Sequence, residues 1–65
     1  MRVNIMFGLN HVAHDEAHIE TARLIRSVAD KLAETEHALM PGDVFILRDI
    51  NGNRVGVMDI LEDRL

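Results

Sequence analysis

Three histidines near the N-terminus have the residue type and spacing that could bind a metal ion. His11, His14 and His18 are three and four residues apart. Positions four apart lie on one face of a helix, so His14 and His18 could hold an ion between them, with Asp15 or Glu16 adding an oxygen ligand. This pattern supports one functional hypothesis, a metal-binding (zinc) or pH-responsive domain.

A simpler interpretation of the same histidines is structural. His11 and His14 would lie in a solvated loop, and His18 would end the apolar face of a helix. Histidine spacing without a further set of ligands is a weak signal. The helical zinc-protease motif requires glutamate directly after its first histidine, whereas this chain has Asp15 after His14. The structural interpretation is therefore preferred, and the metal site is kept as the alternative.

Other catalytic patterns are missing from the sequence. Ser27 is the only serine, and no base is placed near it by the pattern. The four glycines do not form a phosphate-binding loop, because they are scattered at the ends and turns of the predicted elements. A chain of this length also has little core in which to form a catalytic pocket. We therefore expect that the protein is not an enzyme.

Length and charge limit the function further. The 65 residues form one small domain (1–65) with a net charge of −4 and no cysteine. Nucleic-acid binding is disfavoured, because it would require a basic stripe or stacking aromatic residues, and the only aromatics are Phe7 and Phe45. No apolar run is long enough to span a bilayer, and no signal-peptide pattern is present. These features predict a cytoplasmic protein.

The segment from about Asp15 to Leu39 is predicted to form one amphipathic helix. Most of its apolar residues fall within about 60° of Ile25 when each residue is turned by 100°, and most of its charged residues fall on the far side. Leu24 lies off this apolar face, roughly 100° from Ile25, and Glu36 falls near its centre. Asp15 is the expected N-cap residue. Pro41 and the glycine after it end the helix.

Two further segments predict β-strands. Residues 2–7 alternate, with Val3, Ile5 and Phe7 pointing to one face. Residues 43–61 contain two apolar runs that flank Asn51-Gly52, a strong signal for a hairpin with a two-residue type I′ turn. That turn would place Asp49 opposite Arg54, a complementary pair.

The resulting prediction is an α+β fold with the order β-α-β-β, in which one long amphipathic helix packs on a three-stranded sheet. The first strand could pair with the second in parallel or with the third in antiparallel orientation. The helix is placed on the face that carries Phe45, Leu47, Met58 and Ile60. The opposite face is half apolar and is the predicted interface: Val44, Ile46, Arg48, Val55, Val57 and Asp59.

These features favour a small acidic protein–protein interaction module. A domain of this size needs extra burial, and a symmetric homodimer is the commonest way to obtain it. Compact chains without catalytic residues are often inhibitors or accessory proteins that bind a larger protein, including those of phages and mobile elements. We therefore expect a homodimer with a larger protein partner. The apolar sheet face is the predicted interface, and whether it binds the second copy or the larger protein is left open by the sequence.

Overall fold

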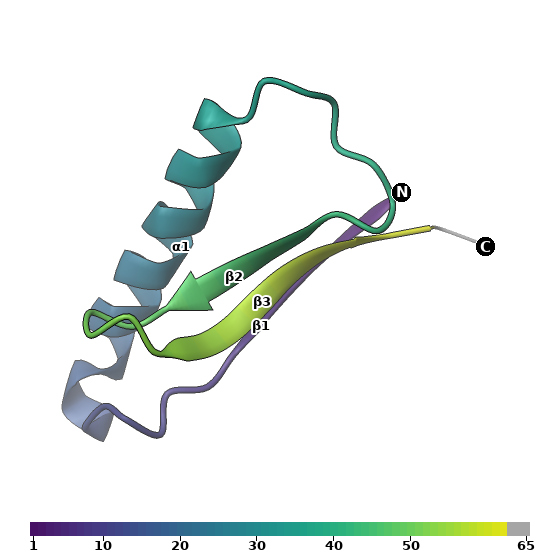
Figure 1. Ribbon diagram of the computed structural model, residues 1–65. Helices are drawn as coiled ribbons and strands as arrows, with labels where there is room; N and C mark the ends of the chain where they lie inside the picture. The colour runs from purple at the N-terminus through teal and green to yellow at the C-terminus, as the bar shows by residue number, and fades with distance from the viewer. Residues whose placement is uncertain (63–65) are drawn as a thin grey trace.

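The computed structural model describes residues 1–62, which form one helical layer on a three-stranded sheet (Figure 1). The predicted α+β fold with β-α-β-β order is confirmed. A short 3₁₀ turn, η1, precedes the helix. The elements are β1 (Arg2–Phe7), η1 (His14–Glu16), α1 (Ala17–Glu34), β2 (Val44–Arg48) and β3 (Arg54–Leu61).

The strands pair in the order β1-β3-β2, and both pairings are antiparallel. This settles the choice that the sequence left open, because β1 lies beside β3 and not beside β2. Ile5 faces Met58 across the β1–β3 ladder, and Phe7 faces Gly56. Val3, Ile5 and Phe7 therefore share the face of the sheet on which α1 packs.

The helix is shorter than predicted at both ends. Asp15 lies in η1, and no side chain caps the start of α1. The 18 residues of α1 span about 27 Å at 1.5 Å per residue. At Thr35 the backbone becomes extended (φ −73°, ψ 125°), so the predicted continuation to Leu39 is wrong. Acidic residues at the negative end of the helix dipole disfavour that continuation, and Leu39 packs against the core from the following loop instead.

The buried face of α1 also differs from the prediction. Leu24 is fully buried, whereas Ile25, the predicted centre of the apolar face, is 51% exposed. Val28 is buried with Leu24. The centre of the buried face therefore lies between Leu24 and Val28, about 80° around the helix from Ile25.

Two cationic side chains of α1 also reach the outer edge of β2 in this orientation. The Lys31 ammonium donates to the carbonyl oxygen of Ile46 at 2.8 Å. The Arg23 guanidinium donates to the carbonyl oxygen of Arg48 at 3.1 Å. Hydrophobic periodicity contains no information about these contacts, so it could not choose between neighbouring faces that both carry apolar residues.

The β2–β3 hairpin follows the predicted register only away from its turn. Leu47 faces Gly56 as predicted, but the next pair joins Arg48 to Arg54, so one residue of β3 is bulged. Asp49 does not pair with Arg54. The Asp49 carboxylate accepts hydrogen bonds from the backbone N–H groups of Asn53 and Asn51. These bonds lower the pKa of Asp49 below its usual range, and the bond from Asn53 has the larger effect.

The hairpin turn is closed at Gly52 and is not the predicted type I′ turn. The Gly52 N–H donates to the carbonyl oxygen of Asp49, and Gly52 has a φ of 86°. Asn51 has no positive φ, which a type I′ turn would require. The extra residue in the turn accounts for the bulge. Because of it, Arg48 pairs with Arg54 and Val55 has no partner on β2.

The core is small and lies between α1 and two strands, β2 and the central strand β3. Its buried members are Leu24, Val28, Leu47, Met58 and Ile60. Figure 1 shows that α1 lies nearest to β2 and moves away from the strands toward its C-terminal end. Residues of β1 therefore receive little cover from the helix, and several of its apolar side chains stay exposed.

Candidate interaction surfaces

The sheet face opposite α1 is an open surface with an apolar centre. Val44 is 56% exposed, and Ile46 and Val57 beside it are half-buried. From β1, Met6 lies opposite Val57 and is 67% exposed. No element within residues 1–62 packs over these side chains. We call this set of residues, Met6, Val44, Ile46 and Val57, the open face.

Met6 is absent from the interface predicted from the sequence, because that prediction used only the residues of the β2–β3 hairpin. The alternation in residues 2–7 shows that Met6 points away from Ile5, but not which strand lies beside it. Once β1 pairs with β3, Met6 extends the apolar patch next to Val57. Asn4 is added for the same reason, and its side-chain amide donates to Asp59 at 3.2 Å.

Of the other predicted interface residues, Arg48 and Asp59 lie beside the apolar centre, whereas Val55 packs against the core. Arg48 is exposed and donates to the carbonyl oxygen of Gly52, so its side chain lies along the hairpin. Asp59 is half-buried beside Asn4. Val55 packs against the core cluster because the bulge removes its partner on β2. The open face is therefore narrower at the hairpin end than the sequence predicted.

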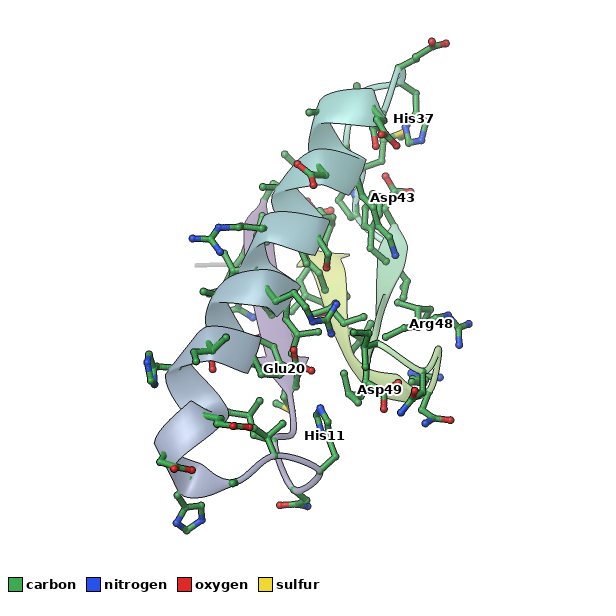
Figure 2. All side chains as sticks on the ribbon, turned by 90° about the vertical axis from the view of Figure 1, so that its left-hand side faces the viewer. His11, Glu20, His37, Asp43, Arg48 and Asp49 are labelled. Atoms are coloured by element: carbon green, nitrogen blue, oxygen red, sulfur yellow. The ribbon has the colours of Figure 1, made fainter. Side chains whose placement is uncertain are left out.

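A second feature is a polar cluster where the loop after β1 meets α1. Figure 2 shows His11 directed toward Glu20, with Asp49 of the hairpin beside them. The His11 Nε2 donates to Glu20 Oε2 at 2.9 Å. Arg23 donates to both carboxylate oxygens of Glu20 and, from the same guanidinium, to the hairpin carbonyl described above. This cluster connects the loop, the helix and the hairpin.

Glu20 is the residue that this cluster affects most strongly. Its side chain is 13% exposed. The hydrogen bonds from Arg23 and then from His11 lower its pKa from 4.5 to about 2. Because the folded-state pKa lies below the unfolded value, ionised Glu20 stabilises the fold above about pH 4.5, and this contribution is lost as the pH falls toward 2.

We expect Glu20→Gln to reduce the acid sensitivity of the protein. The wild type should lose stability between about pH 4.5 and pH 2 as Glu20 is protonated, whereas the variant has no carboxylate to protonate at this site. Urea unfolding followed by circular dichroism at pH 6 and pH 2.5 measures the difference. Asp30→Asn, at an exposed position of α1, is the matched control. An equal pH dependence of Glu20→Gln and wild type would contradict the assignment.

An open groove of about 590 Å³ lies beside the polar cluster. Its walls come from the loop after β1, the first turns of α1 and the hairpin, and they include Glu20, Asp49 and the apolar side chains of Ile19 and Ile50. Both isoleucines are largely exposed. The groove is a shallow surface depression with a mixed lining, and the carboxylates of Glu20 and Asp49 in it are already engaged in the hydrogen bonds described above.

The structure separates the three histidines by their surroundings. His11 is bound to Glu20, His14 is exposed in η1, and His18 is exposed on the first turns of α1. Among residues 1–62, no group of three or more His, Cys, Asp or Glu side chains is arranged to hold a metal ion. His37 lies at the other end of the helix from His11 (Figure 2). Metal binding at His11, His14 and His18 stays a prediction.

Comparisons with known proteins supply no function for this chain. No protein-family model, curated protein or solved structure matches it. Within residues 1–62, no helix has the length and apolar character needed to cross a membrane. The functional argument therefore depends on the surfaces themselves.

Proposed function

We propose that this protein is a non-enzymatic interaction module that binds a larger protein through its open face, as an inhibitor or accessory protein. The observation that carries the proposal is the exposed apolar centre at Val44 and Met6, on a sheet whose other face already holds the helix. Apolar patches of this kind on small soluble domains are typical of protein interfaces. A cysteine-free chain suits a reducing compartment, so we place this activity in the cytoplasm.

The charges around the open face indicate the chemistry of the partner. The chain has a net charge of −4, yet Arg2 and Arg48 lie on the side of the sheet that carries the open face, and its aspartate, Asp59, is hydrogen-bonded to Asn4. The complementary surface is therefore an apolar patch with carboxylates at its rim. Such an arrangement fixes the orientation of binding, while burial of the apolar centre supplies the affinity.

Val44→Asp is expected to weaken partner binding at least tenfold without unfolding the protein. A carboxylate at the centre of a buried interface loses its hydration without gaining a partner. The exposed position of Val44 leaves the fold intact. The experiment isolates a binding protein by affinity capture with the wild type and then measures the dissociation constants of wild type and variant for the purified partner by calorimetry.

Ile50→Asp is the matched control for this experiment, because Ile50 is also an exposed β-branched residue but lies at the tip of the hairpin. It should bind the partner like the wild type. Equal affinity of Val44→Asp and wild type would contradict the assignment of the open face. Loss of affinity in both variants would show that charge alone, and not position, controls binding.

A further inference from the structure

The first strand, β1, is the most exposed strand of the sheet. Five of its six residues are exposed, and only Phe7 is half-buried. The strand order β1-β3-β2 makes β1 an edge strand, so β3 is its only neighbour in the sheet. An edge strand has a row of backbone N–H and C=O groups that no other strand of the chain pairs with.

The outward backbone groups of β1 can be assigned from its ladder with β3. The Gly8 N–H donates to the carbonyl oxygen of Val55 at 3.0 Å, in the register of the β1–β3 pairs. Hydrogen-bonded pairs alternate along an antiparallel ladder, so the even-numbered residues of β1 direct their backbone groups toward β3. The N–H and C=O groups of Val3 and Ile5 therefore point away from the sheet.

The two edges of the sheet differ in the contacts that their backbone groups make. At the β2 edge, the outward carbonyl groups of Ile46 and Arg48 accept hydrogen bonds from Lys31 and Arg23 of α1. In β1, the one side-chain hydrogen bond found within residues 1–62 joins Asn4 to another side chain and not to backbone. Edge strands are commonly protected by lysine, proline or a bulge, and β1 has none of these. The β1 edge is therefore available for pairing.

The side chains on the two faces of β1 indicate which kind of strand fits this edge. Val3 and Ile5 are apolar and about half exposed, on the side of the sheet where α1 packs. Arg2, Asn4 and Met6 alternate with them on the side of the open face. Directly opposite side chains of paired strands interact, and complementary pairs are favourable. A matching strand therefore has apolar residues opposite Val3 and Ile5, polar residues between them, and a carboxylate opposite Arg2.

We propose that the larger partner adds an extended strand of this kind to β1, in antiparallel orientation, as the fourth strand of the sheet. In strand addition, main-chain hydrogen bonds supply affinity and alternate side chains supply specificity. This strand addition rests on the proposed function, because the strand belongs to the protein that binds the open face. Met6 lies both in β1 and in the open face, so one continuous surface of the partner covers both.

A second copy of the chain fits the β1 edge less well than a strand of the partner. A stable dimer buries about 800 Å² on each protomer, and the six residues of β1 span only about 20 Å. Because α1 lies nearest to β2, the helices of two copies joined at β1 would be too far apart to add to this area (Figure 1). A strand of a protein that also covers the open face adds to an existing interface and does not have to supply the whole area.

Amide hydrogen exchange of the full chain, followed by nuclear magnetic resonance during titration with a synthetic peptide, tests the proposal. The peptide is as long as β1 and alternates valine with threonine, so that valine lies opposite Val3 and Ile5, and it ends in a glutamate opposite Arg2. Exchange of the Val3 and Ile5 amides is expected to be fast in the free protein and about fivefold slower at millimolar peptide. The outward amides of Val44 and Ile46 at the β2 edge should not change and are the internal control.

Ile5→Pro separates main-chain pairing from side-chain contact. Proline removes the outward N–H of this position without removing a hydrogen bond to β3, so the variant should bind the peptide at least about tenfold more weakly than Ile5→Ala. Ile5→Ala is the matched control, because it also loses the isoleucine side chain but keeps the N–H. Circular dichroism establishes that both variants are folded, and the exchange pattern of the wild type decides the result if Ile5→Pro unfolds.

Slower exchange at Val3 and Ile5 alone, with weaker binding by Ile5→Pro than by Ile5→Ala, supports the proposal. Unchanged exchange of these two amides, equal slowing at both edges of the sheet or equal binding by the two variants would overturn it. Slow exchange in the free protein that increases with protein concentration would assign the edge to a second copy and would also overturn it. In the complex with the captured partner the same two amides should be slowed, and unchanged rates there would contradict the proposal. Folded Val44→Asp should still bind the peptide, so a failure at the β1 edge is distinguishable from a failure of the open face.

Discussion

Gly56→Ala is expected to remove most of the stability of the fold. Gly56 lies in β3, the central strand, between Leu47 of β2 and Phe7 of β1. A Cβ at this position would overlap the carbonyl oxygen of Met6 and the backbone of Phe7. Backbone atoms cannot rotate away as a side chain can, so β1 would have to separate from β3.

The expected cost of this substitution is large for a domain of this size. Overpacking typically costs about 1–3 kcal/mol, and a clash with backbone should reach about 3 kcal/mol or more. A core of this size supplies only about 3–5 kcal/mol in total. Urea unfolding followed by circular dichroism measures the change. Gly8→Ala is the control, because no atom lies within 4 Å of the place its new methyl group would take and its φ is not positive. Equal stability of the two variants would contradict the close approach of β1.

Leu24→Ala is expected to be strongly destabilising, and Ile25→Ala is not. Leu24 is fully buried in the cluster with Val28, Leu47 and Met58, so its truncation leaves a cavity and should cost about 2–5 kcal/mol. Ile25 is half exposed, and its truncation should cost less than about 1 kcal/mol in the monomer. The two residues are neighbours in the same helix, so the comparison tests which face of α1 is buried.

The measurement is the free energy of unfolding in urea for the two variants at low protein concentration, where self-association contributes little. The reverse order of stability, with Ile25→Ala more destabilised than Leu24→Ala, would restore the helix orientation predicted from periodicity and contradict the structure.

Local sequence patterns predicted the elements well but not their ends or orientation. The alternation in residues 2–7 and the apolar runs around the hairpin produced the three strands, and the assignment of Phe45, Leu47, Met58 and Ile60 to the helical face is confirmed. These successes depend on burial that alternates every two residues. This alternation is a local property of the chain, so it can be recognised in the sequence.

The features that the sequence did not predict depend on contacts between distant parts of the chain. The rotation of α1 depends on the packing of Leu24 and Val28 against residues of β2 and β3, and Arg23 and Lys31 support it by reaching carbonyl groups of β2. The bulge depends on Asp49 accepting backbone hydrogen bonds at the turn instead of pairing with Arg54. The Asp15 start and the helical extension to Leu39 were wrong because propensity alone does not weigh acidic residues near the helix end against loop packing.

The candidate surfaces show the same division between local and distant information. Val44, Ile46 and Val57 could be predicted as one face from alternation and the hairpin register. Alternation also places Met6 on the face opposite Ile5, but its position beside Val57 requires the strand order. The contacts of Arg23 and Lys31 with carbonyl groups of β2 require the rotation of α1, so no sequence pattern of this chain contains them.

The central claim is that this domain binds a larger protein through the open face. The most direct test is the dissociation constant of folded Val44→Asp for the captured partner, measured by calorimetry beside wild type and Ile50→Asp. The account predicts that Val44→Asp binds at least tenfold more weakly than the wild type, whereas Ile50→Asp binds with the affinity of the wild type. Wild-type affinity of Val44→Asp would place the binding surface elsewhere on the domain and contradict the claim.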